Sequence, residues 1–420
     1  MATPYLSRNP LLFRTARQFA LLLAMLMSGG NLIVPRIPLL VLGLGVVFLC
    51  KGPTLGIRRE MWPIGLLLFA VLAVVVLGAG GGYDLVALIT RYGAFLMGAA
   101  LVGLYLDLPA PTLATDLRPM LRLMAIQAAL TVVVAAVAGG LFVPFQVQDA
   151  TYYTFLGLFT FHRTVTETGG FVRPDGFFFE PGVFQIYLNI FLFISLFVTK
   201  RLRDIGIAVV GVMATRSTTG VLIMCLLLGG AYLLRFRYAS RGERLLAFLA
   251  APVGAAALLI IASQNLLEKT VGVQRGSAWA REYDFRTGLN IIREHPFFGI
   301  GFDVDRYREE SRRLGYADTQ LSFSAAQDRT SSNGLVVLVA SVGIPLSLAF
   351  FWAMLRQRLF PRPWLFAGLL LMSFVGEALV LTPFFLLIMF SGLLSAGRAR
   401  VPARPRTGWR PPAAEEPRSA

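Results

Sequence analysis

Arg173 and Glu180 are the first residues in the chain whose types and spacing suit chemistry. They stand seven positions apart, in a stretch restrained by Pro174, Gly176 and Pro181. A carboxylate directly before a proline suits the first turn of a helix, where the helix dipole favours negative charge. That structural interpretation accounts for Glu180 and leaves Arg173 unexplained. The functional interpretation is a general base beside a guanidinium group that binds an anion.

Arg281 opens a second polar stretch, which ends at His295 and Pro296. Residues 282–294 are predicted to form a helix that stops before the proline. A cation at the start of a helix is disfavoured by the dipole, so Arg281 marks a local conflict of the kind found at functional sites. His295 is interpreted first as a helix-end residue, with catalysis as the weaker alternative, and His162 is interpreted in the same way.

Two further charges lie inside predicted membrane spans, where a charge is expensive and usually functional. Arg91 lies in the apolar stretch 84–106, towards its outer end. It either pairs with Asp84 or reaches an anion near the membrane surface. Glu377 lies in the stretch 363–380 and either forms a buried structural pair or partners a functional arginine.

Metal-binding residue types are scarce. His162 and His295 are the only two histidines, and Cys50 and Cys225 both lie in apolar runs. Such cysteines are usually small core residues, and two histidines offer little material for a zinc or iron site. We therefore predict no metal centre and no cofactor.

The composition shows that membrane-spanning helices must hold these residues in place. The 420 residues are 56% hydrophobic and 15% charged, whereas soluble domains are about 45–50% apolar and roughly 25% charged. A soluble enzyme is thereby excluded. A bilayer-crossing helix needs about 20 apolar residues. The candidate spans are 18–34, 37–50, 62–80, 84–106, 119–143, 181–199, 204–215, 217–234, 244–263, 333–354, 363–380 and 383–397. We predict an all-α polytopic membrane protein with about twelve transmembrane helices, ten to twelve in all.

The net charge of +16 is concentrated at alternate junctions between these spans. With the N-terminus inside, the inside segments carry 24 of the 39 Lys and Arg residues but only seven of the 23 acidic residues. This asymmetry follows the positive-inside rule, and it places both termini in the cytoplasm. The charge therefore reports membrane topology and gives no reason to expect a nucleic-acid partner.

Two outer loops are unusually long, and long ordered loops are often functional. The first is rich in aromatic residues, which are interpreted as an interfacial belt or an amphipathic helix, or alternatively as a stacking surface for sugars or lipid. The second contains predicted helices at 282–294 and 303–314. The predicted organisation is 1–143 (five spans), 144–180 (first large loop), 181–263 (four spans), 264–332 (second large loop), 333–397 (three spans) and 398–420 (a disordered, basic cytoplasmic tail).

These motifs resemble those of a known family. The run from Arg173 through Gly176 to Glu180-Pro181-Gly182 resembles the first outer-loop motif of bacterial O-antigen and exopolysaccharide polymerases of the Wzy type. Arg281, followed after thirteen residues by His295-Pro296-Phe297-Phe298-Gly299-Ile300-Gly301, resembles the large-loop signature of the O-antigen ligase/polymerase superfamily.

Two more features extend the resemblance to roughly residues 170–350. Arg216 is followed by Ser217-Thr218-Thr219-Gly220, which resembles a recurrent opening of a span in that family. Ser332-Asn333 resembles the start of the next span, except that the ligase branch usually has His-Asn there. This departure makes ligase activity less expected and leaves the general base open among Glu180, His162 and His295, with Asn333 a further possible site residue.

The resemblance implies a metal-independent, inverting glycosyl transfer on the periplasmic side of the inner membrane. The implied donor is an oligosaccharide linked to a polyprenyl diphosphate such as undecaprenyl diphosphate, and the acceptor is another lipid-linked repeat unit. Arg173, Arg216, Arg281 and Arg91 are the candidates for binding the diphosphate, and Glu180 is the candidate base. A flippase and a chain-length regulator are the implied partners, besides membrane lipids. The alternatives are an O-antigen ligase that uses a lipid or protein acceptor and a transporter of lipid-linked sugars.

Overall fold

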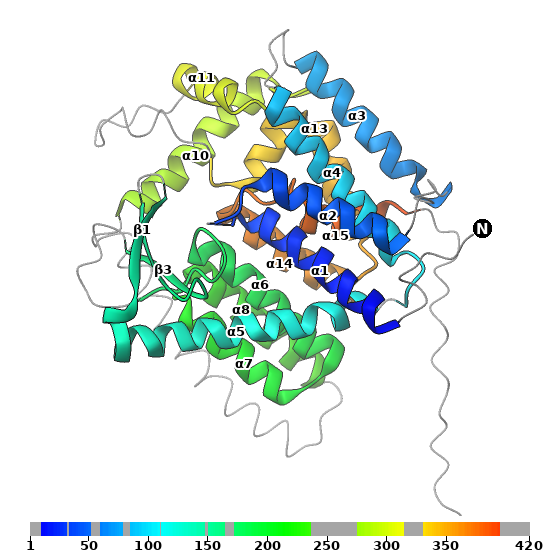
Figure 1. The fold of residues 1–420 in the computed structure, drawn as a ribbon. Coiled ribbons are helices and arrows are strands. Elements are labelled where there is room, and N and C mark those ends of the chain that lie inside the picture. Colours follow the sequence, from blue (N-terminus) through cyan, green and yellow to red (C-terminus); the bar gives the residue numbers. More distant parts are fainter. Residues whose placement is uncertain are drawn as a thin grey trace, which may run out of the picture.

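The computed structural model describes residues 10–31, 33–51, 59–78, 85–109, 111–147, 150–163, 172–236, 275–314 and 331–394. The predicted span 244–263 and the predicted tail 398–420 lie outside these ranges. Figure 1 shows a bundle of helices with a small sheet at one side, next to the end of α5. In chain order the helices are α1 (Pro10–Gly29), α2 (Arg36–Lys51), α3 (Trp62–Gly78), α4 (Leu85–Tyr105), α5 (Thr112–Ala138), α6 (Pro181–Ile194), α7 (Leu202–Ala214), α8 (Thr218–Phe236), α10 (Arg275–Glu294), α11 (Val304–Leu314), α13 (Gly334–Leu355), α14 (Pro363–Gly376) and α15 (Pro383–Leu393).

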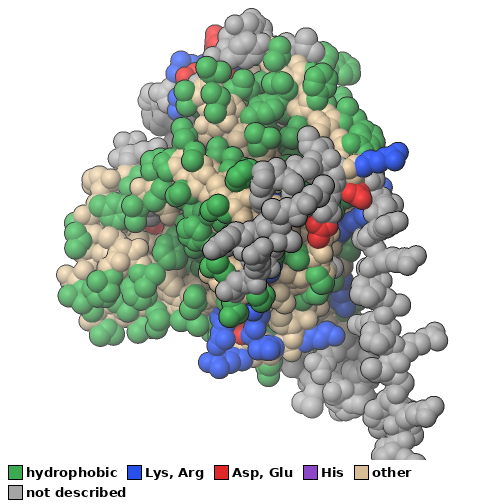
Figure 2. Space-filling view, turned by 45° about the vertical axis from the view of Figure 1, so that its right-hand side comes forward, with side chains coloured by type: hydrophobic (Ala, Val, Ile, Leu, Met, Phe, Trp, Pro, Cys, Tyr) green, Lys and Arg blue, Asp and Glu red, His purple; other side chains and the backbone are tan. Residues whose placement is uncertain are grey.

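Membrane-spanning length is reached by only some of these helices. Within the described residues, six helices are long and apolar enough to cross a bilayer, and three more apolar helices are shorter. The expected count of about twelve spans is therefore not confirmed. Helix α7, predicted as a span at 204–215, has 13 residues, which extend for only about 20 Å. Figure 2 shows hydrophobic side chains spread over the visible face, as expected for a protein that contacts lipid.

Helices α6 and α15 form the centre of the bundle. Every residue of α6 from Val183 to Ile194 is buried, and so is every residue of α15 from Pro383 to Gly392. Helices that are apolar on all sides are typical of the interior of a bundle. The first turn of α6, which follows Glu180, is thereby fixed at the core.

One end of the bundle is held by buried ion pairs. Arg17 of α1 donates from Nε to Asp116 at 2.9 Å, and the hydroxyl of Tyr105 donates to the same carboxylate at 3.0 Å. Arg118 of α5 donates to Asp204 of α7 at 2.7 Å. These contacts join the starts of α1, α5 and α7 to the end of α4, so these helix ends share one end of the bundle.

The first large loop contains a sheet, so the all-α expectation is wrong in this segment. Strands β1 (Val143–Val147), β2 (Ala150–Phe155) and β3 (Phe159–Arg163) pair antiparallel in the order β1-β2-β3. Its aromatic residues stack across strands: Tyr153 lies 5.2 Å from Phe161 between ring centroids. Aromatic cross-strand pairs stabilise sheets, which explains why this run forms strands and no amphipathic helix.

The described part of the second large loop, residues 275–314, contains two helices as predicted, and the segment between them satisfies the backbone at a break in α13. Gly343 has non-helical backbone angles (φ 76°) and interrupts that helix. The amide of Ile300 donates to the carbonyl of Ala340 at 2.8 Å, and the amide of Ile344 donates to the carbonyl of Pro296 at 2.8 Å. Irregular backbone at membrane depth is tolerated where protein satisfies its polar groups. The motif at residues 295–301 therefore has a structural role.

The ion pairs around Asp116 give a test of the fold. Arg17 is buried, whereas the side chain of Arg14 is 52% exposed and lies 3.6 Å from the same carboxylate. We expect Arg17→Ala to lower the apparent unfolding midpoint strongly, since breaking a buried pair costs about 3–5 kcal/mol. Arg14→Ala is the matched control, with an expected cost of about 0–1 kcal/mol. Thermal unfolding of the purified variants in detergent measures both, and equal effects would contradict this account.

Candidate functional site

Glu180 and Glu377 meet at the start of α6. Glu180 is the residue before that helix and has an extended backbone, with Pro181 in the first turn. Glu377 follows the last residue of α14, so it lies beyond the end of this helix and not within a span at 363–380 as predicted. A side-chain carbon at Gly182 would overlap the carboxyl oxygen of Glu377. The glycine of the Glu-Pro-Gly motif therefore provides the space in which the two carboxyl groups approach each other.

The two carboxyl groups share a hydrogen bond. Burial is the main cause that raises the pKa of Glu377 well above its ordinary value, and the charge and hydrogen bond of Glu180 raise it further. The nearby positive charge of Arg281 acts in the opposite direction. Two carboxyl groups in contact cannot both ionise easily, so the buried Glu377 retains its proton next to Glu180.

Arg281 lies beside this pair. Helix α10 begins at Arg275, so Arg281 lies inside the helix and the argument from its position at a helix start is wrong. A side-chain carbon at Gly376 would lie 4.0 Å from an Nη atom of Arg281 and 3.9 Å from the hydroxyl of Thr219. The end of α14, the start of α8 and a face of α10 thus converge on one guanidinium group.

Arg173 and Arg216 meet the turn between α7 and α8. The Nε of Arg173 donates to the carbonyl of Thr215 at 3.4 Å. Arg216, the next residue, is exposed and has a left-handed backbone with φ 51°. Such a conformation is uncommon outside glycine and clusters at functional sites. The charges of Arg173 and Glu180 both act on Asp175, so both residues lie near that carboxyl group.

Asp175 is a site residue that the sequence reasoning missed, although it lies within the Arg-Pro-Asp-Gly run. Its buried carboxylate is 2.9 Å from Nδ1 of His162, and its amide donates to the carbonyl of Thr160 at 3.0 Å. Burial raises the pKa of Asp175 to about 6, against the opposing effects of His162 and Arg173. These contacts fasten the loop that carries Arg173 and Glu180 to strand β3, so His162 here positions the loop.

Asn333 caps helix α13. Its side chain accepts hydrogen bonds from the amides of Leu335 and Val336 at 3.1 and 3.2 Å, which is a preferred arrangement at a helix start. The preceding Ser332 donates from both its amide and its hydroxyl to Asp284 at 2.9 and 2.8 Å. Asp284 was also missed, because a buried acid on a charged helix cannot be distinguished from a solvated one in the sequence.

Helix α13 also packs against the carboxyl pair. A side-chain carbon at Gly334 would overlap the backbone carbonyl of Glu377. The position at which the ligase branch carries histidine, here Ser332, is therefore two residues from a direct contact with the site.

His295 does not join this group. It lies fourteen residues after Arg281, about 20 Å further along α10, and its Nε2 is 3.6 Å from Glu310 of α11. Among the described residues, Glu294, His295 and Glu310 each offer one possible metal-ligand atom, and these three atoms lie within 4.8 Å of one another. Arg313 already pairs with both glutamates, at 2.5 and 2.6 Å. The arrangement is explained as an ion-pair network that joins α10 to α11.

Arg91 also lies apart from the carboxyl pair, beside Arg36 at the start of α2. Asp84, its alternative partner, lies outside the described residues. Arg36 was missed by the sequence reasoning, because the residue stands at a span boundary where arginines are common.

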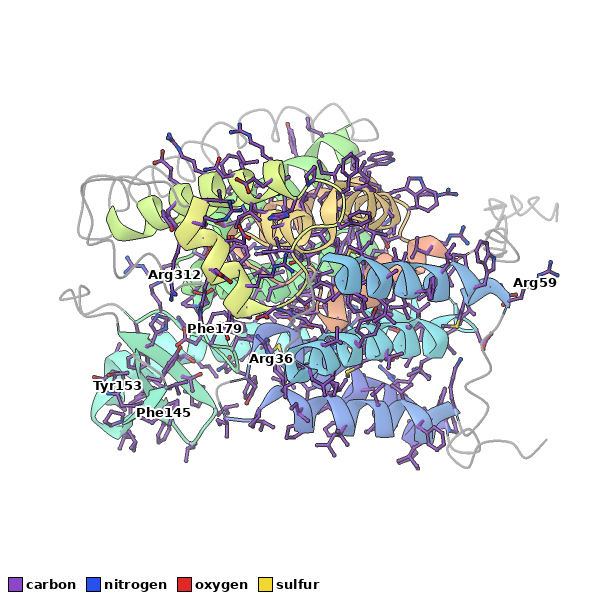
Figure 3. The ribbon with its side chains drawn as sticks, turned by 90° about the horizontal axis from the view of Figure 1, so that it is seen from above. Arg36, Arg59, Phe145, Tyr153, Phe179 and Arg312 are labelled. Carbon is purple, nitrogen blue, oxygen red and sulfur yellow. The ribbon has the colours of Figure 1, made fainter. Side chains whose placement is uncertain are left out.

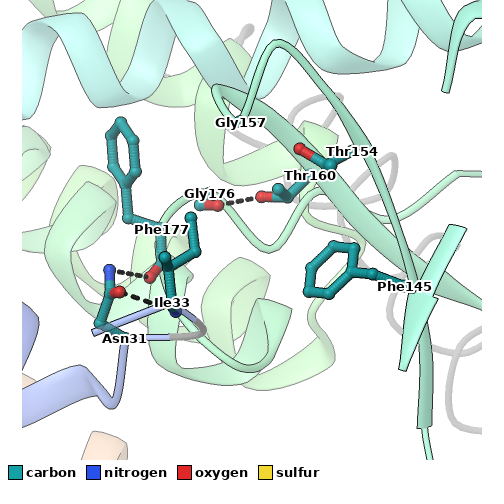
Figure 4. A pocket seen from close by; sticks show the side chains of 8 residues that line it. All are labelled: Asn31, Ile33, Phe145, Thr154, Gly157, Thr160, Gly176 and Phe177. Carbon is teal, nitrogen blue, oxygen red and sulfur yellow. Dashed lines mark hydrogen bonds between the residues drawn. The ribbon is translucent and has the colours of Figure 1, made fainter. Parts of the chain in front are cut away.

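A small apolar cavity adjoins the loop of Arg173 and Glu180. It has a volume of about 180 Å³. Figure 4 shows it between the connection of α1 to α2 on one side and the sheet on the other, with a hydrogen bond from Thr160 to the carbonyl of Gly176 at its wall. Phe145 and Phe177 contribute aromatic faces to the lining. Such a lining suits the apolar face of a sugar ring or an isoprenoid segment.

These features define a membrane protein whose helices gather two carboxyl groups and several arginines at one end. Residues 205–351 match the family model described as O-antigen ligase (Wzy_C). The resemblance to the O-antigen ligase/polymerase superfamily is thereby confirmed for this segment. Members of that family are membrane glycosyltransferase-like enzymes that act on lipid-linked oligosaccharides. The match contains Arg216, Arg281 and Asn333, whereas Glu180 and Glu377 lie on either side of it. No curated protein matches the chain.

The contact between Asp175 and His162 gives a test that depends on pH. The pKa of Asp175 is raised from 3.8 to about 6 on folding, so a stabilising contribution of the neutral form is present below pH 4 and is lost as the pH rises through 6. Asp175→Asn cannot ionise and keeps a hydrogen-bonding group. We expect the unfolding midpoint of Asp175→Asn, relative to that of the natural protein, to be higher at pH 7 than at pH 4.

Asp175→Ala lacks the hydrogen-bonding group and serves as the control. It should be less stable than Asp175→Asn at both pH values. A difference between natural protein and Asp175→Asn that does not change with pH would contradict the assignment.

Proposed function

We propose that the chain is a polysaccharide polymerase of the bacterial inner membrane. It joins polyprenyl-diphosphate-linked repeat units of an O-antigen or exopolysaccharide on the periplasmic side. The observation that supports this proposal best is the contact of Glu180 with Glu377, whose carboxyl group also lies within reach of the charge of Arg281. Arg173 lies on the same loop as Glu180 and donates to the turn that carries Arg216. The arrangement offers a proton acceptor near a group of cations. Transfer of a sugar from a diphosphate leaving group requires both: a base for the attacking hydroxyl group and positive charge for the leaving diphosphate.

The arginines bind the diphosphate of the donor in this proposal. A guanidinium group keeps its charge and pairs with phosphate oxygens through two parallel hydrogen bonds. Arg173, Arg216 and Arg281 come from three separate segments, and together they neutralise the charge that develops on the leaving diphosphate. Positive groups that are fixed before the reaction stabilise this charge without reorganisation.

Glu180 accepts the proton of the attacking hydroxyl group. The acceptor oxygen forms a bond to the anomeric carbon of the donor while the bond from that carbon to the diphosphate oxygen breaks, which inverts the anomeric centre. The proton moves to the carboxylate, and the electron pair leaves with the diphosphate. Glu377, whose pKa is raised by burial and by Glu180, keeps its proton, so that the carboxylate of Glu180 is the member of the pair that acts as the base.

An O-antigen ligase is the second candidate, since the matching family model carries that description. Ser332, in place of the histidine of the ligase branch, favours the polymerase. In both cases the proposal places the termini in the cytoplasm, in keeping with the arginine distribution, and includes a flippase and a chain-length regulator as partners. Undecaprenyl diphosphate is the proposed carrier.

Arg281→Ala tests the proposal in the bacterium. We expect loss of long polymer, with single lipid-linked repeat units accumulating on the periplasmic side, because the donor diphosphate is no longer neutralised. Arg286→Ala is the matched control, since Arg286 is exposed on the same helix and pairs with Glu282 at 2.6 Å. Gels of surface polysaccharide and extraction of lipid-linked intermediates measure the outcome. Finished polymer left on its carrier would identify a ligase, and repeat units accumulating on the cytoplasmic side would identify a transporter.

The carboxyl pair is tested separately by two substitutions. We expect Glu180→Gln to lower the rate of polymer formation by roughly a hundredfold or more, as is typical for loss of a general base. Gly182→Ala should reduce activity as well, because the new methyl group displaces Glu377. Gly206→Ala is the control, since a side-chain carbon there meets no neighbouring atom within 4 Å. Normal polymer length in Glu180→Gln would remove Glu180 from the mechanism.

A further inference from the structure

Helices α2 and α4 lie side by side in parallel. Leu40 of α2 packs so closely against Gly93 of α4 that a side-chain carbon at the glycine would overlap it. Further along, Met97 of α4 packs in the same way against Gly43 of α2. Both contacts advance in the same chain direction, so the two helices run parallel and their relative height is fixed.

This register brings two arginines to the same level. Arg36 lies one turn before Leu40, and Arg91 lies two residues before Gly93. The two positive charges are close enough to act on each other. Arg91 is half-buried, whereas Arg36 is exposed.

Neither arginine is neutralised by protein within the described ranges. Arg36 and Arg91 form no hydrogen bond or ion pair with any residue that the structure describes. Arg36 is also the first residue of α2, where the helix dipole adds further positive potential. The charge of Arg36 and the start of α2 therefore both lie near Arg91, an arrangement that a bound anion would stabilise.

The pair lies on the same side of the molecule as the loop of Arg173 and Glu180. The connection between α1 and α2 contacts that loop: the side chain of Asn31 donates to the carbonyl of Phe177 at 3.1 Å. Figure 3 shows Arg36 towards Phe179 and the sheet, with Arg59 at the opposite end of the bundle. No contact among the described residues joins Arg36 or Arg91 to the carboxyl pair itself.

We propose that Arg36 and Arg91 form a second anion site, separate from Arg173, Arg216 and Arg281, which binds the diphosphate of the acceptor lipid. This inference rests on the proposed function, since a polymerase must hold two lipid diphosphates at once. The acceptor keeps its diphosphate, and a whole repeat unit separates this group from the hydroxyl that attacks. Its binding site must therefore lie away from Glu180 but at the same level of the membrane.

The test counts diphosphates bound to the purified full-length protein in lipid nanodiscs. The probe is a short polyprenyl diphosphate, and native mass spectrometry counts the molecules bound per chain. We expect two on the natural protein and one on the variant Arg36→Ala/Arg91→Ala, whose second binding event weakens by roughly tenfold to a hundredfold. Arg59→Ala is the matched control and should bind two. If the alanine variant does not fold, Arg36→Lys/Arg91→Lys takes its place. This variant keeps both charges, and we expect it to bind two probe molecules, the second with weaker affinity than on the natural protein.

Each outcome bears on one proposal. Unchanged binding by Arg36→Ala/Arg91→Ala overturns the second site and leaves the proposed function untouched. Equal competition by phosphatidylglycerol for this site also overturns it, because the site would then bind phospholipid headgroups in general. Arg281→Ala should lose the other diphosphate and retain this one. If Arg281→Ala forms normal polymer while Arg36→Ala/Arg91→Ala still loses one bound probe, the anion site stands and the proposed function fails.

Discussion

A carboxyl group that enters an apolar bundle needs space and a partner, and the contact between Glu180 and Glu377 depends on both. Gly182 provides the space, since any side chain there would displace Glu377. Because the carboxyl groups share a hydrogen bond, the start of α6 and the end of α14 are held together by the pair itself. Arg281 approaches from α10, and Gly334 of α13 packs against the carbonyl of Glu377. Four helices thus take their relative positions at one end of the bundle from a single pair of acids.

The two ends of the bundle differ in how their charged side chains are paired. At the end that contains Asp116 and Asp204, each of these two buried carboxylates lies next to arginines of the protein itself. At the other end like charges stand together, with Glu180 beside Glu377 and Arg36 beside Arg91. Such arrangements cost stability and persist where a function requires them.

The sequence reasoning selected several residues that the structure brings together, but it missed others. Charged residues in a stretch restrained by proline and glycine identified Arg173 and Glu180, and an isolated acid identified Glu377. Asp175 could not be recognised, because its burial depends on the pairing of β3 with the loop. The strands were missed because aromatic residues suit both a sheet and a membrane interface. The expected count of spans is not confirmed for short helices such as α7, which has 13 residues.

The repaired break in α13 has a consequence for how the protein is made. The backbone groups that satisfy the break belong to residues 296–301, which are synthesised before α13 itself. Until that segment is in place, the amide of Ile344 and the carbonyls of Ala340 and Ser341 face hydrocarbon without partners, at a cost of several kcal/mol each. Insertion of α13 into the bilayer therefore cannot be completed helix by helix. Residues 296–301 must lie against the break before α13 can be buried, so the folding of this half of the protein follows the order of its chain.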